Sequence, residues 1–266
     1  MKVIFFGDIV GRAARAAVAR ILPTWQKTYQ PDAIIGNVEN LAHGKGVSQG
    51  TLDELLTLGF TAFTSGDHVL NRPEADVLLQ NPYYPLIRPA NFPDNTAGRG
   101  SMRISVGSRE LLVINLIGQV FIEGDFSSPF SVVDKIIADE TAKGEVSGII
   151  VDLHAEATSE KVAMGWYLDG RATAVLGTHT HVPTCDAWIL PKGTAYVSDV
   201  GMTGVRESVI GVKTEQSLSR FLTGERTHFE PAEVGTVQVT AMLVTFDPGN
   251  RRATSIERLT EYVTAG

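Results

Sequence analysis

Short, continuous apolar runs recur along the chain, and they limit its folds more than any other feature of the sequence. Runs of this length are typical of strands that are buried on both faces of a sheet. Helical patterns lie between several of them, and a turn sequence at residues 247–250 predicts a closing antiparallel pair. Strands that alternate with helices before a hairpin predict an α/β or mixed-sheet layered fold. The expected strands are 3–6, 33–38, 62–64, 111–116, 148–153, 174–176 and 195–197, the helices 12–29, 51–58, 73–79, 132–142, 159–168 and 215–222, and the hairpin strands 236–246 and 253–259.

The composition is that of an ordinary globular protein: 266 residues, 43% hydrophobic and 20% charged. No repeat or linker divides the chain, so we expect one domain over residues 1–266, with a small capping subdomain formed by loops within 69–130. No apolar run reaches the roughly eighteen residues of a membrane span and the N-terminus lacks a signal-peptide pattern, so we expect a cytoplasmic protein. The single cysteine, Cys185, excludes an intrachain disulfide and is expected in or beside the core, although its place after the histidines raises the question of a metal ligand.

The net charge of −7 excludes one large class of function. Proteins that bind nucleic acids along their length carry clustered basic surfaces, and no dense run of lysine and arginine occurs here. We therefore expect no bulk nucleic-acid binding. Small nucleotides or RNA ends stay open as ligands, because bound metals can make a local site positive on an acidic protein.

Polar side chains follow five of the expected strands, directly where each strand ends. Because the carboxyl ends of strands in α/β sheets gather along one edge, these residues can meet although they are far apart in the sequence. A lone buried histidine is usually a core residue with satisfied hydrogen bonds, but five strand ends with such donors point to a site. These residues are Asp8, Glu39, Asn40, Asp67, His68, His154, His179, Thr180 and His181.

Carboxylates and imidazoles together are ligands that suit zinc, manganese and iron. The set is large enough for two ions, with one carboxylate shared between them. A site of that kind activates water and binds both the attacking and the leaving oxygen of a phosphoryl group. The sequence therefore predicts a two-metal site for phosphoryl chemistry.

Three other features have weaker functional interpretations. Residues 46–50 match the G-x-S-x-G pattern of serine hydrolases, but the strand ends near Val38 and a loop intervenes before Ser48. His43 and Lys45 lie on that loop, where they either contact the substrate or are plain loop residues. His228 lies in a polar stretch and is expected at the surface.

Several motifs resemble those of a known superfamily. Gly7-Asp8, Asn37-Val38-Glu39-Asn40, Gly66-Asp67-His68 and Gly177-Thr178-His179-Thr180-His181 resemble the blocks of calcineurin-like metallophosphoesterases. Longer strings at 38–46, 88–93, 152–161 and 199–204 resemble the YmdB branch of that superfamily. The resemblance covers nearly the whole chain.

The resemblance implies a four-layer αββα sandwich of two mixed sheets flanked by helices, with two iron or manganese ions, zinc being a further option. It implies a phosphodiesterase that acts on 2′,3′-cyclic nucleotides at the 2′ bond through a hydroxide shared by the two ions. His68 would donate a proton to the leaving oxygen. By position, the ligands of one ion would be Asp8, Glu39, Asn40 and His181, and those of the other Glu39, Asp67, His154 and His179.

The sequence departs from the superfamily at two positions. Val10 stands where many members have histidine in an Asp-x-His block, an absence that the YmdB branch shares, and Asn40 would fill that ligand position. Asp67 stands where the branch usually has asparagine. The additional carboxylate would lower the net charge of two divalent ions and their ligands from about +2 to about +1. We therefore expect firmer metal binding and weaker electrostatic help to the transition state.

Three alternatives stay open: a phosphomonoesterase or nucleotidase with the same site, a metal-stabilised nucleotide-binding regulator with little turnover, and a serine hydrolase that uses Ser48. The expected partner is a small phosphodiester or nucleotide substrate. A homo-oligomer is the default assembly for an enzyme of this kind.

Overall fold

Two six-stranded mixed sheets form the centre of the computed structural model, which describes residues 1–224 and 228–265. In the first sheet the strand order is β10-β11-β1-β2-β3, with β12 beside β11. Its strands are β1 (Lys2–Asp8), β2 (Ala33–Asn37), β3 (Ala62–Thr64), β10 (Gly204–Val205), β11 (Gly235–Phe246) and β12 (Ala253–Ala265). β1, β2 and β3 are parallel, the long strand β11 runs antiparallel to β1, and β12 runs antiparallel to β11 in a hairpin.

The second sheet has the order β4-β5-β6-β7-β9-β8. Its strands are β4 (Ser101–Val106), β5 (Arg109–Ile117), β6 (Gly148–His154), β7 (Ala174–Thr178), β8 (Trp188–Ile189) and β9 (Ala195–Val197). β5, β6, β7 and β9 are parallel, while β4 and β8 close the two edges as antiparallel strands. Both sheets are therefore mixed.

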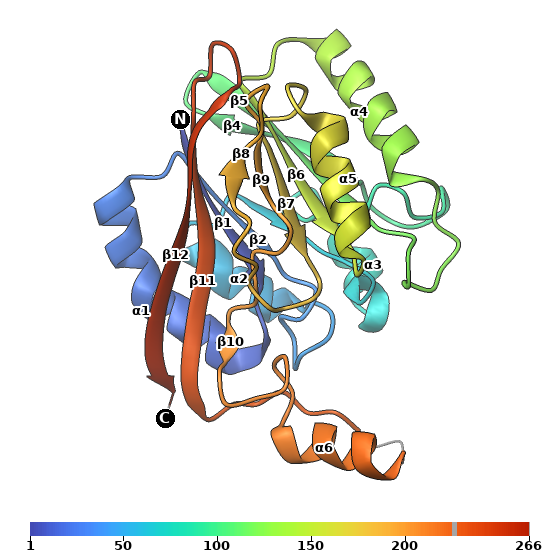
Figure 1. Ribbon diagram of the computed structural model, residues 1–266, viewed down its shortest axis with the longest axis vertical. Helices are drawn as coiled ribbons and strands as arrows, with labels where there is room; N and C mark the ends of the chain where they lie inside the picture. Colours follow the sequence, from blue (N-terminus) through green and yellow to red (C-terminus); the bar gives the residue numbers. More distant parts are fainter. Residues whose placement is uncertain (225–227, 266) are drawn as a thin grey trace.

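Helices cover the outer face of each sheet (Figure 1). Side chains of α1 and α2 share a core cluster with the first sheet, and side chains of α4 and α5 share one with the second. The helices are α1 (Gly11–Tyr29), α2 (Gln49–Thr57), α3 (Ala75–Gln80), α4 (Pro129–Lys143), α5 (Thr158–Leu168) and α6 (Thr214–Thr223), with a 3-10 turn at η1 (Val69–Asn71). These four layers confirm the αββα sandwich.

Alternation along the strands builds the layers. In β1, Val3 and Phe5 belong to the cluster between the two sheets, whereas Ile4 and Phe6 pack toward the helices. Successive side chains of a strand point to opposite faces, so a continuous apolar run supplies two cores at once. This arrangement explains why the parallel strands β2, β3, β6 and β7 have few polar residues except near their carboxyl ends.

Two differences from the sequence-based expectations concern the middle of the chain. The sequence did not predict β4, because an edge strand with mixed polarity lacks a continuous apolar run; its only buried residue is Ile104. α3 begins at Ala75 rather than residue 73. The expectation of one domain with a small cap formed within 69–130 stays a prediction. Among the described residues, no helix is long and apolar enough to cross a membrane.

Candidate metal centre

The polar residues that follow the parallel strands lie together at one edge of the two sheets. β1 and β6 end in their own donors, while the donors after β2, β3 and β7 stand on the loops directly beyond those strands. Main-chain geometry places two of the histidines unusually: His179 has φ 96° and His181 has φ 66°. Such conformations are unfavourable for residues other than glycine and persist where surrounding contacts fix them. Here the backbone N–H of His179 donates to Oδ2 of Asp8 at 3.1 Å, and the carbonyl oxygen of His181 accepts from the backbone N–H of Met202 at 2.9 Å.

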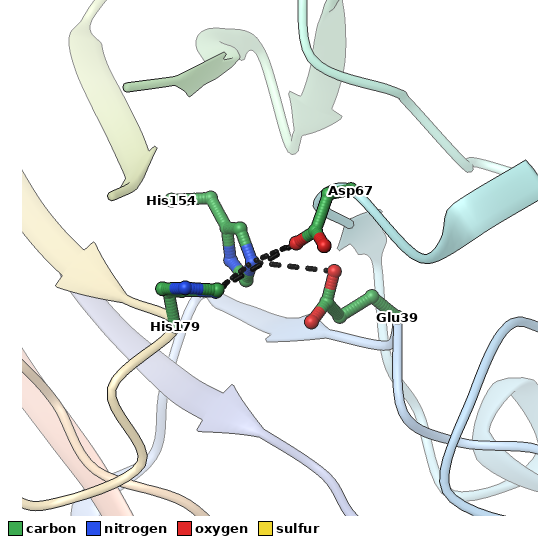
Figure 2. Close-up of side chains that lie close together, drawn as sticks. All are labelled: Glu39, Asp67, His154 and His179. Atoms are coloured by element: carbon green, nitrogen blue, oxygen red, sulfur yellow. Dashed lines mark hydrogen bonds and ion pairs between the residues drawn. The ribbon is translucent and has the colours of Figure 1, made fainter. Parts of the chain in front are cut away.

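Four of these side chains form a tight group (Figure 2). Nε2 of His154 lies 3.2 Å from Oε2 of Glu39, 3.2 Å from Oδ1 of Asp67 and 3.0 Å from Nδ1 of His179. One ligand atom from each of the four residues falls within 4.8 Å of the others. Glu39 and His154 are buried and Asp67 and His179 are half-buried, so the group is partly accessible to solvent at the edge of the sheets.

A second group adjoins the first. Nε2 of His181 lies 3.3 Å from Oδ1 of Asn40 and 3.8 Å from Oδ1 of Asp8. Nδ1 of His181 lies 2.7 Å from the carbonyl oxygen of Ile210, which accepts its proton and leaves Nε2 free for a ligand. Oδ1 of Asp8 also lies 3.9 Å from Nδ1 of His154, so the groups share a boundary.

The side chains fit divalent metal ions on two further observations. Oδ1 of Asp8 is buried and has no hydrogen-bond partner among the described residues, and buried oxygens of this kind are normally paired. Gly66 lies so close to the first group that an added Cβ would be 2.2 Å from Oε2 of Glu39 and 2.3 Å from the His154 ring. The missing side chain leaves room for the donors to converge. Carboxylate, amide and imidazole donors together suit zinc, manganese or iron.

Without a metal, the group is held together by charge. Burial raises the pKa of Glu39, but the charge and hydrogen bond of His154 outweigh this effect and keep that pKa below its ordinary value. Burial likewise opposes ionisation of Asp67, and hydrogen bonds from His154 and His68 lower its pKa strongly. Burial disfavours the charged form of His154, yet Glu39 and Asp67 raise its pKa well above the ordinary value. The cluster therefore holds a proton on His154 that a metal ion would replace.

His68 lies beside the first group. Its Nδ1 is 3.0 Å from Oδ2 of Asp67, and its backbone N–H donates to Oε2 of Glu39 at 3.2 Å. The hydrogen bond to Asp67 raises the pKa of His68, against the opposing effects of burial and of the Lys45 charge. The geometry thus favours a charged imidazole, and within the described part of the chain no hydrogen bond involves its Nε2.

The two loop residues of the sequence analysis, His43 and Lys45, have different surroundings in the structure. The charge of Lys45 is close enough to act on His68, whereas exposed His43 lines a neighbouring cavity of about 630 Å³ together with Phe229 and Pro231. The role of either residue in substrate binding stays a prediction. His228 is exposed, as the sequence indicates.

Two other sequence features have structural explanations. Ser48 is the N-cap of α2, where its hydroxyl accepts from the backbone N–H of Thr51 in a capping box. The expectation that Cys185 lies in or beside the core is wrong: it is exposed on the irregular segment between β7 and β8. It is not part of the metal-ligand group found among the described residues.

Sequence reasoning missed several residues that contact the histidines. Oε2 of Glu156 lies 3.1 Å from Nε2 of His179, and the hydroxyl of Thr178 lies 2.9 Å from Nδ1 of His154. Asp152 and Asn37 lie beneath them, fully buried. The available signal was a carboxylate inside the apolar run of β6, which has no reason to be there without buried partners.

The chain is similar in sequence and in fold to several known proteins. A family model described as "YmdB-like protein" matches residues 4–259. A protein of Bacillus subtilis named 2′,3′-cyclic-nucleotide 2′-phosphodiesterase is 43% identical over 260 residues, which cover 97% of this chain and 96% of that protein. Crystal structures of a Thermus thermophilus protein and of a Mycoplasma pneumoniae phosphatase each superimpose with a TM-score of 0.91. The Thermus protein is 38% identical, and the alignment covers 98% of this chain and 99% of that one. The Mycoplasma phosphatase is 34% identical, and the alignment covers 100% of this chain and 94% of that one.

Proposed function

The chain belongs to the YmdB-like protein family, and from that premise we propose that it is a metal-dependent phosphodiesterase that hydrolyses 2′,3′-cyclic nucleotides at the 2′ bond. The adjoining donor groups around Nε2 of His154 and Nε2 of His181 carry this proposal, because together they can bind two ions. The Bacillus relative, which is named for this activity, aligns over nearly all of both chains.

The ligand assignment follows the two groups. Asp8, Asn40 and His181 would bind one ion, and Asp67, His154 and His179 the other. Glu39 would bridge, which agrees with its buried place beside His154. Iron or manganese are the proposed metals and zinc is the alternative, since all three accept mixed imidazole and carboxylate ligands.

Two ions, when bound, would supply an activated water and charge to neutralise the phosphoryl oxygens of the substrate. The protein's own contribution is proton delivery and orientation. His68 donates its Nε2 proton to the departing 2′ oxygen as the bond from phosphorus to that oxygen breaks, which leaves a 3′-phosphomonoester. Asp67 accepts from Nδ1 of His68 and so directs Nε2 away from the carboxylate. A homo-oligomeric state and a cytoplasmic location complete the proposal.

The first experiment is hydrolysis of bis-p-nitrophenyl phosphate and then of 2′,3′-cyclic AMP by metal-stripped protein, with manganese or iron added back. We expect turnover only with metal and 3′-AMP as the product. Faster hydrolysis of p-nitrophenyl phosphate than of the diester would identify a monoesterase instead. No turnover with two ions bound per chain would identify a nucleotide-binding regulator.

A matched pair of histidine variants tests the proposed acid. His68→Gln should lower kcat about 10²- to 10⁴-fold while two metals per chain remain by elemental analysis. His228→Gln, which changes an exposed histidine, should leave kcat unchanged. Full turnover of the His68 variant with both metals bound would exclude this role.

A further inference from the structure

A buried chain of polar side chains runs beneath the metal centre. Nδ1 of His154 lies 2.9 Å from the hydroxyl of Thr178, and that hydroxyl lies 2.7 Å from Oδ1 of Asp152. Asn37 and Thr64 reach the other oxygen of Asp152. All five residues are fully buried, so each of their protons must go to a partner within the protein.

The amide of Asn37 has no proton to spare for His154. Its Oδ1 accepts from the backbone N–H of Glu39 at 3.1 Å, which fixes the orientation of the amide. The two protons on Nδ2 then go to the carbonyl oxygen of Ser65 at 3.1 Å and to Oδ2 of Asp152 at 3.0 Å. The hydroxyl oxygen of Thr178, at 3.4 Å, and Nδ1 of His154, at 3.5 Å, are more distant neighbours of Nδ2.

Within the described residues, every hydrogen-bond partner of the Asp152 carboxyl group is a donor. The hydroxyl of Thr64 donates to Oδ2 at 2.5 Å, beside the Asn37 amide, and the hydroxyl of Thr178 donates to Oδ1. A threonine hydroxyl has one proton, and in Thr178 the carboxylate takes it. With that proton given to Asp152, the oxygen of Thr178 faces Nδ1 of His154 only as an acceptor, so the tautomer that satisfies both atoms has the proton on Nδ1. Oδ1 of Asp8, 3.9 Å from Nδ1, is beyond hydrogen-bond distance.

We infer that Asp152 and Thr178 are positioning residues for the metal centre: Asp152 accepts from Thr178, Thr178 accepts from Nδ1 of His154, and the lone pair of Nε2 is thereby directed at Glu39, Asp67 and His179. The inference rests on the proposed function in one respect, that Nε2 of His154 is a metal ligand. A partner on the second nitrogen of a ligating histidine fixes the ring and its tautomer. Here the partner is the Thr178 hydroxyl, which in turn donates to the carboxylate of Asp152.

The direct test is the proton position on His154 in zinc-loaded protein, read by ¹⁵N-detected NMR of labelled histidine. Zinc is the probe because it is diamagnetic. The His154 resonance, identified by its loss in His154→Gln, should show a proton on Nδ1 and a metal-bound Nε2. A proton on Nε2 would overturn the inference. The unmutated chain carries this test, so it does not depend on whether a Thr178 variant folds.

Affinity for manganese supplies the second test. Thr178→Val keeps the shape of the side chain but removes the hydroxyl, and it should weaken one of the two manganese sites about 10- to 100-fold. Thr178→Ser restores the hydroxyl and should restore the affinity. Thr173→Val is the matched control: it removes another fully buried hydroxyl, one that accepts from the backbone of Ile149, and it should leave both affinities unchanged.

Equal manganese affinities in Thr178→Val and the parent would overturn the inference. So would an equal loss in Thr173→Val, because it would show a general effect of destabilisation. No substrate enters either measurement. A protein that binds two manganese ions as expected but fails to hydrolyse cyclic nucleotides would leave this inference standing and refute the proposed function.

Discussion

Oδ2 of Asp67 lies 3.0 Å from Nδ1 of His68, the residue that follows it in the chain. The other carboxylate oxygen, Oδ1, faces His154 at 3.2 Å and His179 at 3.6 Å. One carboxylate therefore contacts both the proposed metal ligands and the proposed acid. Its charge acts in two opposite ways, since it reduces the positive charge offered to the phosphoryl group and keeps His68 protonated.

Asp67→Asn separates these two effects. Removing a negative charge should raise kcat at acidic pH, where His68 is charged in either protein, and should weaken metal binding. The hydrogen bond to Asp67 raises the pKa of His68, so its loss lowers that pKa and activity should fall at a lower pH than in the parent. The measurement is kcat against pH with manganese in excess. An unchanged or lower kcat at acidic pH contradicts the proposed effect of the Asp67 charge. If activity falls at the same basic pH in variant and parent, Asp67 does not raise the pKa of His68.

Metal affinity should depend on pH through His154. Burial favours the neutral ring, but Glu39 and Asp67 raise its pKa well above the ordinary value in the metal-free protein. A metal ion must displace that proton, so affinity should rise about tenfold per pH unit for one displaced proton, up to the pKa of His154. Calorimetric titration with manganese in buffers of different ionisation heat counts the protons released. Heats that do not depend on the buffer would show that His154 is already neutral.

The candidate site was largely predictable because of a topological regularity. Parallel strands present their carboxyl ends at one edge, so Asp8, Glu39 and His154 could be grouped without knowing any distance. The shared edge also brings donors from both sheets together, as the 3.2 Å separation of His154 and Glu39 shows. The division of donors between ions came from the family resemblance and stays a prediction.

Other features depended on contacts that a sequence pattern does not contain. Asp152 is two residues from His154 in β6, but its function depends on Thr178 and Asn37, which come from other strands. β4 had no apolar run to mark it, since only Ile104 in it is buried. Cys185 was misplaced because a small apolar side chain gives little local information about burial.

Ser48→Ala distinguishes a capping serine from a catalytic one. Ser48 accepts from the backbone of Thr51 at the start of α2, so its loss should lower the free energy of unfolding by about 1 kcal/mol. Metal-dependent hydrolysis of the diester should be unchanged. Denaturant unfolding and the kcat assay check the two statements separately. Loss of turnover in a folded variant would revive the serine-hydrolase alternative.

Lys161→Met should destabilise the loop that carries two proposed ligands. Nζ of Lys161 lies 2.7 Å from Oδ2 of Asp199, and both side chains are buried. The same oxygen accepts from the backbone N–H and hydroxyl of Thr180, the residue between His179 and His181. Removing the lysine leaves Asp199 buried without its cation, which should cost about 3–5 kcal/mol of unfolding free energy. Denaturant unfolding of the metal-free protein measures this loss.

The double variant Lys161→Met/Asp199→Asn decides whether charge is the cause. A neutral side chain at position 199 no longer needs a cation, so the double variant should recover much of the stability that Lys161→Met loses. It should still bind metal more weakly than the parent. In the parent, Thr180 and Gly201 donate to different oxygens of the Asp199 carboxylate, whereas the amide of asparagine offers them only one oxygen. Stability that falls further in the double variant would show that packing of the lysine stem, rather than the unpaired carboxylate, is what the single variant disturbs.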